Sequence, residues 1–86
     1  MQALYFSGSW CKPCKAFLPI VEAVCSEKGL DLHTVDVERE TDMTNQHYVK
    51  AVPTLIIVDE KGFEVYRTSS ALPSATLLSV LEDLRI

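Results

Sequence analysis

Two cysteines near the start of the chain, Cys11 and Cys14, are the residues whose type and spacing most directly indicate chemistry. Separated by two residues at a helix start, they can close a small disulfide ring. Unpaired backbone N–H groups and the helix dipole favour a thiolate there, and the first cysteine benefits most because it lies at the very end. Lys12 and Lys15 add positive charge nearby. We therefore expect the pKa of Cys11 to lie below the roughly 8.5 of a free thiol.

This arrangement predicts a two-step thiol–disulfide exchange. The Cys11 thiolate attacks a substrate disulfide and forms a mixed disulfide. Cys14, which we expect to be more buried, then attacks the Cys11 sulfur and releases the reduced substrate. We expect Cys11 to be exposed, with Trp10 beside it as an apolar platform for partners, although a tryptophan is also a common core residue.

Zinc binding and haem attachment are other uses of paired cysteines. A zinc ribbon needs two more ligands, and the candidates are Cys25, His33 and His47. Cys25 follows Cys14 by three helical turns, about 16 Å along the axis, which excludes a shared site and a disulfide. The two histidines are too far apart for a zinc finger, and haem attachment needs a histidine where Lys15 stands. We predict no metal site and interpret Cys25 as a small buried hydrophobe.

The pattern around the cysteines predicts alternating strands and helices. A helical period of three and four begins at Cys11 and stops at Lys28–Gly29, and a turn at Asp59–Gly62 joins two strands into a hairpin. The expected elements are a strand at Gln2–Ser7, a helix from Cys11 to Lys28, a strand at Leu30–Val37, a short helix within Thr41–Lys50, strands at Thr54–Val58 and Phe63–Thr68, and a helix at Ser74–Leu84. The order β-α-β-α-β-β-α predicts an α/β fold with one mixed four-stranded sheet flanked by three helices.

Two helical details are also expected. Pro19 falls inside the first long helix and should bend it. Leu77, Leu81 and Leu84 recur at helical spacing and should lie on one face of the last helix.

Length and composition limit the possible functions. With 86 residues there is room for one small domain, 1–86. A net charge of −4 argues against a nucleic-acid surface, and the longest apolar runs, Ala3–Phe6 and Leu55–Val58, are far shorter than a membrane span. Three cysteines do not suit a secreted disulfide scaffold, and no apolar leader follows Met1, so we expect a cytoplasmic protein.

Several segments together resemble the thioredoxin family. Trp10–Lys15 (WCKPCK) is similar to the thioredoxin motif WCxPCK, and Pro19 stands where the family has a proline five residues after the second cysteine. Val35–Glu38 resembles the end of a family strand, and Val49–Thr54 resembles the segment that carries the family's cis-proline. The resemblance runs from about Ala3 to Leu84. It implies a thioredoxin fold without the additional N-terminal strand and helix, as in the short thioredoxins of phages and archaea.

The resemblance implies an activity and its site residues. The chain would be a protein-disulfide reductase with Cys11 as nucleophile and Cys14 as resolving cysteine. The Val52–Pro53 bond would be cis and lie beside the cysteines, although Pro53 could instead simply start an edge strand. The substrate-binding residues implied are Trp10, Lys12, Pro13, Val52, Pro53 and Ser70.

The resemblance also implies partners. Electrons would come from NADPH through a thioredoxin reductase, with no cofactor bound to the chain. Substrates would be disulfide-containing proteins, with ribonucleotide reductase as one candidate, and the chain would act as a monomer without nucleic acid or membrane.

Four positions depart from the family pattern. Tyr5 stands where thioredoxins have a buried Asp on the first strand, and Thr34 stands where its lysine partner lies. Tyr5 should be a poor base, although its hydroxyl could form a hydrogen bond. Ser70 replaces a glycine and could narrow the substrate groove, and Lys12 replaces the commoner glycine between the cysteines. We expect Tyr5 and Lys15 to tune the cysteine pair.

Three alternative functions stay open from the sequence. One is a glutaredoxin-like reductase, although the glutaredoxin CPYC motif and its Gly-Gly-Asp element are not matched here. Another is a thioredoxin-like binding subunit that acts independently of its thiols. The last is an oxidase or isomerase, which a reducing compartment disfavours.

Overall fold

The computed structural model describes residues 1–86, which form four strands and three helices in the predicted order. The elements are β1 (Gln2–Ser7), α1 (Lys12–Lys28), β2 (Asp31–Asp36), α2 (Thr41–Gln46), β3 (Thr54–Val58), β4 (Glu64–Thr68) and α3 (Ser74–Asp83). Every element lies within its predicted range. The predicted α/β fold, with one mixed sheet and three helices, is therefore confirmed.

The strands form one sheet in the order β2-β1-β3-β4. β1 runs parallel to β2, since α1 connects them, whereas β3 is antiparallel to both β1 and β4. The register pairs Phe6 with Thr54. The start of β3 therefore lies beside the end of β1, where the chain leaves the sheet toward Cys11.

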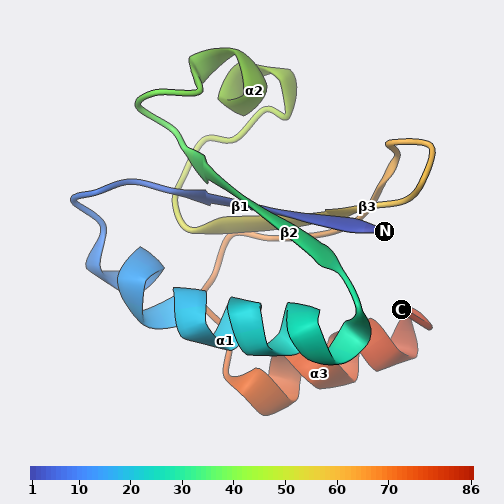
Figure 1. Cartoon of the computed structure of the whole chain (residues 1–86). Helices are drawn as coiled ribbons and strands as arrows, with labels where there is room; N and C mark the ends of the chain where they lie inside the picture. Colours follow the sequence, from blue (N-terminus) through green and yellow to red (C-terminus); the bar gives the residue numbers. More distant parts are fainter.

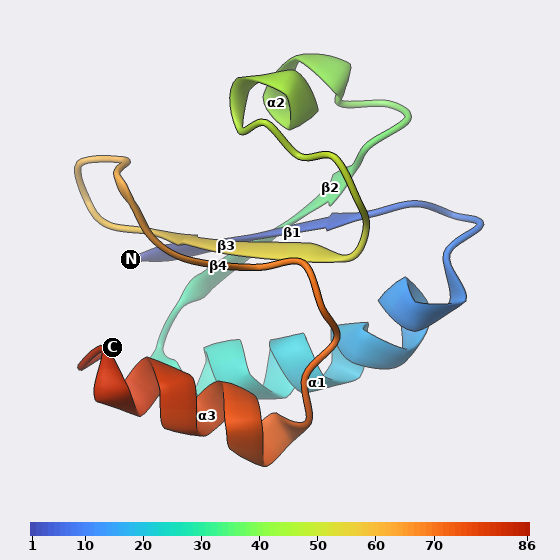
Figure 2. The same ribbon diagram turned by 180° about the vertical axis from the view of Figure 1, so that it is seen from behind.

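One face of the sheet is covered by α1 and α3, which lie side by side across it (Figures 1 and 2). Alternate residues of the central strands point into this layer because successive strand side chains face opposite ways. The buried cluster beneath the two helices consists of Ala3, Tyr5, Phe17, Val21, Val24, Cys25, Leu30, Leu55, Ile57, Leu77 and Leu81. It is the larger of the two hydrophobic cores.

The opposite face carries only α2, a helix of 6 residues with none buried (Figure 2). The buried cluster on this face has five members: Leu4, Phe6, Val35, Ile56 and Val58. Half-buried side chains from α2 and its flanking segments complete it, namely Val37, Met43, Val49 and Val52.

The helix ends show where local pattern succeeds and where it does not. Gly29 ends α1 in the left-handed conformation at φ 67°, and Gly62 has φ 86° in the hairpin turn, as predicted. α3 ends at Asp83, one residue before the predicted end, and Leu84 is 46% exposed while Leu77 and Leu81 are buried. The residue follows the last helical turn, so helical spacing no longer determines where its side chain points.

Pro19 lies within α1, and its predicted bend stays a prediction. No helix of the structure is both long and apolar enough to cross a bilayer.

Candidate functional site

Cys11 is the N-cap of α1. The chain leaves β1 and turns so that the Cys11 amide donates to the Gly8 carbonyl oxygen at 3.1 Å. Cys11 has extended backbone angles, and its Sγ accepts a hydrogen bond from the Cys14 amide at 3.2 Å. The sulfur thus takes the place that a serine or aspartate oxygen fills at an ordinary N-cap. An amide already points at the atom that must carry negative charge in the reduced state.

Cys11 and Cys14 form a disulfide, with their Cα atoms 5.3 Å apart. Cys14 is 2% exposed, and Cys11 is 4% exposed. The expectation that Cys11 is exposed is wrong for this oxidised form. In this form the Cys11 sulfur is bonded to Cys14 and accepts the hydrogen bond from the Cys14 amide.

Trp10 is 65% exposed next to Cys11 in the sequence, and its role as a platform for partners stays a prediction. Its indole lies against Gly8: a Cβ at Gly8 would come within 2.8 Å of the ring atom Cε2. Any other residue at Gly8 would therefore push the ring away. A glycine two residues before a tryptophan was the signal for this close approach.

Tyr5 lies behind the cysteines, fully buried in the larger core. Its hydroxyl donates to the Cys14 carbonyl oxygen at 2.6 Å, and its ring meets Phe17 edge to face. Burial raises the pKa of the Tyr5 hydroxyl to about 12. Tyr5 is therefore a poor base, as expected, and it ties β1 to the first turn of α1. The Thr34 side chain is exposed, although Thr34 pairs with Tyr5 in the sheet.

A groove of about 280 Å³ opens next to Trp10. It lies between the segment after β2 and the loop that leads from α2 to β3. Its lining is mostly apolar and consists of Trp10, Val37, Thr44, Val49, Lys50, Ala51 and Val52. Trp10 and Val52 are thus brought together as predicted. Val49, Lys50 and Ala51 lie in the segment Val49–Thr54 noted in the sequence, whereas Thr44 had no predicted role in a site.

The loop enters β3 through a cis Val52–Pro53 peptide bond. Pro53 is buried and Val52 half-buried. Directly after them, the Thr54 hydroxyl contacts the Ala51 carbonyl oxygen at 2.6 Å and the Ser69 hydroxyl at 3.2 Å. Sequence reasoning missed this contact, because the two hydroxyls meet only through the register of β3 and β4.

The other predicted residues lie at the rim or away from the groove. Lys12, Pro13 and Lys15 are exposed on the first turn of α1 and are not among the groove's lining residues. Ser70 is exposed in the loop after β4, where its amide contacts the Thr68 hydroxyl at 3.2 Å. Its predicted effect on the groove stays a prediction.

Cys25 is buried on α1 and unpaired. Burial raises the pKa of its thiol to about 11. It therefore remains protonated at neutral pH, in agreement with its interpretation as a core residue. No three His, Cys, Asp or Glu side chains gather where they could hold a metal ion.

Comparison with known proteins adds to this geometry. The family model named Thioredoxin matches residues 2–83. The chain belongs to the thioredoxin family. It is 34% identical over 80 residues to a thioredoxin of Mycobacterium tuberculosis, which covers 91% of this chain and 68% of that protein. The solved structure of thioredoxin 1 from Thermosipho africanus superposes with a TM-score of 0.88 at 28% identity, covering 99% of this chain and 94% of that one.

Relatives of greater length also match. The chain is 32% identical to the chloroplastic thioredoxin Y of rice over 91% of its own length but spans only 47% of that protein. The family and the Cys11–Cys14 disulfide together identify the site as a thiol–disulfide oxidoreductase centre.

Proposed function

We propose that the chain is a protein-disulfide reductase of the thioredoxin type. The observation that carries this proposal is the disulfide at the N-terminus of α1, in which the Cys14 amide points at Cys11 Sγ. In the reduced protein the same amide can stabilise a Cys11 thiolate. Cys14 lies one turn further into the helix and has no comparable position. Cys11 is therefore the nucleophile and Cys14 the resolving residue.

The exchange transfers two electrons to the substrate. The Cys11 thiolate attacks one sulfur of the substrate disulfide, that disulfide breaks, and the leaving thiolate takes up a proton. The deprotonated Cys14 sulfur then attacks Cys11 Sγ and breaks the mixed disulfide, and the second substrate sulfur leaves as a thiolate that is protonated. The substrate is reduced to two thiols and the chain is oxidised to the Cys11–Cys14 disulfide.

The surface around the disulfide binds the substrate. Trp10 and Val52 give the groove apolar walls, and Lys50 is its one charged lining residue. An apolar side chain next to the substrate's cysteine fits this groove. Within this proposal Pro53, Lys12, Pro13 and Ser70 contact the substrate near the disulfide, while Tyr5 and Lys15 tune the cysteines.

Electrons would reach the disulfide from NADPH through a thioredoxin reductase. A relative in Mycobacterium leprae is named "Bifunctional thioredoxin reductase/thioredoxin". The chain is 34% identical to it over 80 residues, which make up 17% of that protein. We propose that the chain acts as a single monomeric domain, 1–86, in the cytoplasm. Its substrates would be disulfide-containing proteins, among which ribonucleotide reductase is one candidate.

A coupled assay tests the function. The oxidised protein is mixed with NADPH and either a thioredoxin reductase or glutathione with glutathione reductase, and insulin serves as the protein disulfide. We expect NADPH consumption with the first system only, and none with Cys11→Ser or Cys14→Ser. Reduction by glutathione alone would contradict the proposal and favour the glutaredoxin-like alternative. Full biological activity of the double serine variant would favour a binding subunit.

A further inference from the structure

The loop between α2 and β3 carries most of the groove, yet few backbone hydrogen bonds hold it. The Tyr48 amide donates to Asn45 and the Val49 amide to Thr44, both at 3.1 Å. The amides of residues 50–52 take part in no backbone–backbone hydrogen bond. Side chains from elsewhere must therefore supply much of the restraint on this loop.

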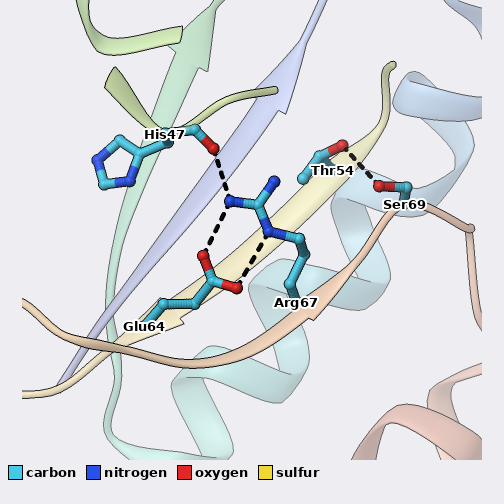
Figure 3. Close-up of polar contacts among 5 residues, drawn as sticks. All are labelled: His47, Thr54, Glu64, Arg67 and Ser69. Atoms are coloured by element: carbon cyan, nitrogen blue, oxygen red, sulfur yellow. Dashed lines mark hydrogen bonds and ion pairs between the residues drawn. The ribbon is translucent and has the colours of Figure 1, made fainter. Parts of the chain in front are cut away.

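Arg67 of β4 supplies a restraint at the start of the loop (Figure 3). Its Nη2 donates to the His47 carbonyl oxygen at 2.6 Å. His47 is the C-cap of α2, so this oxygen belongs to the residue at which the helix gives way to the loop. The contact joins residues 20 positions apart in the sequence.

Glu64 fixes the direction of the Arg67 guanidinium. Its carboxylate accepts from Nη2 at 2.8 Å and from Nε at 3.1 Å, a bidentate arrangement that matches the planar fork of arginine. The guanidinium beside it lowers the pKa of Glu64 from its ordinary value. The carboxylate therefore stays charged and holds the arginine at neutral pH.

An irregularity in β4 makes this pairing possible. Residues three apart on a regular strand point to opposite faces. Here the register shifts, so that Glu64 pairs with Val58 while Arg67 pairs with Ile56. Both side chains consequently stand on the α2 face, where Ile56 and Val58 are buried. The strand irregularity therefore places Glu64 and Arg67 on the same face, where they form an ion pair.

A second contact lies at the other end of the loop. There the Thr54 hydroxyl donates to the Ala51 carbonyl oxygen. It also contacts the hydroxyl of Ser69, just beyond β4 (Figure 3). The loop is thus tied at both ends to β4 or the residue that follows it. Of the two contacts, the one made by Arg67 is charged and joins residues further apart in the sequence, 20 positions against 15 for Thr54 and Ser69.

We propose that Arg67 is a positioning residue for substrate recognition: held by Glu64, it fixes the His47 carbonyl and with it the loop that forms the groove. The proposal rests on the proposed function, because the groove is where protein substrates would bind. Protein disulfides, which need the groove, depend on Arg67. A small disulfide that reaches the cysteines without the groove does not.

The test compares Arg67→Met, which keeps the aliphatic stem, with Arg67→Lys, which keeps one charged donor. Lys61→Met, in the exposed hairpin turn, controls for loss of a positive charge. For Arg67→Met we expect KM for insulin to rise about 10-fold, as for one lost charge-assisted hydrogen bond. Its kcat, and the rate with cystine, should stay within about twofold. Arg67→Lys should raise the KM for insulin less than Arg67→Met does, and Lys61→Met should have the wild-type KM.

A second measurement does not depend on activity. Hydrogen exchange at the Tyr48 and Val49 amides should quicken by about 10-fold in Arg67→Met, while amides of α1 keep their wild-type rates. Equal losses with insulin and cystine, or unchanged exchange at the two amides, would overturn the role of Arg67. A wild-type protein that reduces neither disulfide would instead contradict the proposed function.

Discussion

The two faces of the sheet are held in different ways. The face beneath α1 and α3 has eleven buried residues and two regular helices, so apolar burial fixes it. The α2 face has five buried residues and a helix of 6 residues, and polar contacts from β4 restrain its loop. The cysteine pair stands where the two arrangements meet, at the end of β1. The larger core contacts the cysteine pair through Tyr5, and under the proposed function the groove on the α2 face selects the substrate.

The largest expected loss of stability comes from a substitution in the larger core. Phe17→Ala removes a ring that is 1% exposed and packs against Tyr5, and should lower the free energy of unfolding by about 3–5 kcal/mol. Met43→Ala on the α2 face should cost roughly 1–2 kcal/mol, because Met43 is only half-buried. Urea unfolding of both variants measures the difference, and equal losses would show that the two faces contribute alike.

A middle-sized effect tests the polar restraint at Thr54. Thr54→Val keeps the shape of a side chain that is 1% exposed but removes the hydroxyl bonded to Ala51 and Ser69. We expect a loss of about 1 kcal/mol in unfolding free energy, because a partly buried hydrogen bond is removed. Ser69→Ala, which removes one of the two contacts, is the matched control and should cost less. Equal losses of unfolding free energy in the two variants would mean that the contact with Ala51 contributes nothing to stability.

The pH dependence of stability also distinguishes the two faces. The two groups with large upward pKa shifts, the Cys25 thiol and the Tyr5 hydroxyl, both belong to the larger core. Burial raises the pKa of the Cys25 thiol from 9.0 to about 11 and that of Tyr5 from 10.0 to about 12. Above pH 9 the unfolded thiol loses its proton while the folded one keeps it. Unfolding free energy should therefore fall as pH rises from about 9 to about 11.

Cys25→Ala removes one of these groups and serves as the comparison. Urea unfolding at pH 7, 9 and 10.5 should show a smaller alkaline decline in this variant than in the wild type. Parallel pH profiles for the two proteins would contradict the assignment of the decline to Cys25.

The smallest expected effect concerns the ion pair between α1 and α3. Lys28 Nζ lies 3.3 Å from a Glu82 carboxylate oxygen; the lysine side chain is 16% exposed and the glutamate side chain 62% exposed. Lys28→Gln should cost no more than about 0.5 kcal/mol, because solvent screens such a pair. A thermal or urea unfolding measurement checks this, and a loss as large as that of Thr54→Val would mean that charge also holds the helical face.

Much of the larger core could be predicted from sequence, because its signals are local. The period of α1, the glycine that ends it and the alternation in β1 each lie within a few residues of the element they define. Cys11 and Cys14 belong to the same category, since their spacing at a helix start already indicates exchange chemistry. Leu84 shows the limit, because spacing does not say where a helix ends.

The α2 face could be predicted only in outline. The groove needs Trp10, Val37 and the loop before β3 to meet, and no local pattern records that meeting. The contact of Arg67 with His47 depends on the sheet order and on an irregularity in β4, neither of which has a sequence signal of its own.

The reduction potential of the Cys11–Cys14 pair tests the central claim most directly. It can be measured by equilibrating the protein with a dithiothreitol redox buffer and quantifying free thiols, with Cys25→Ala used so that only the pair is counted. Thioredoxins provide the reference point near −270 mV, and a reductase should have a potential close to it. A value of about −180 to −120 mV would instead assign the chain to oxidants or isomerases and contradict the proposed function.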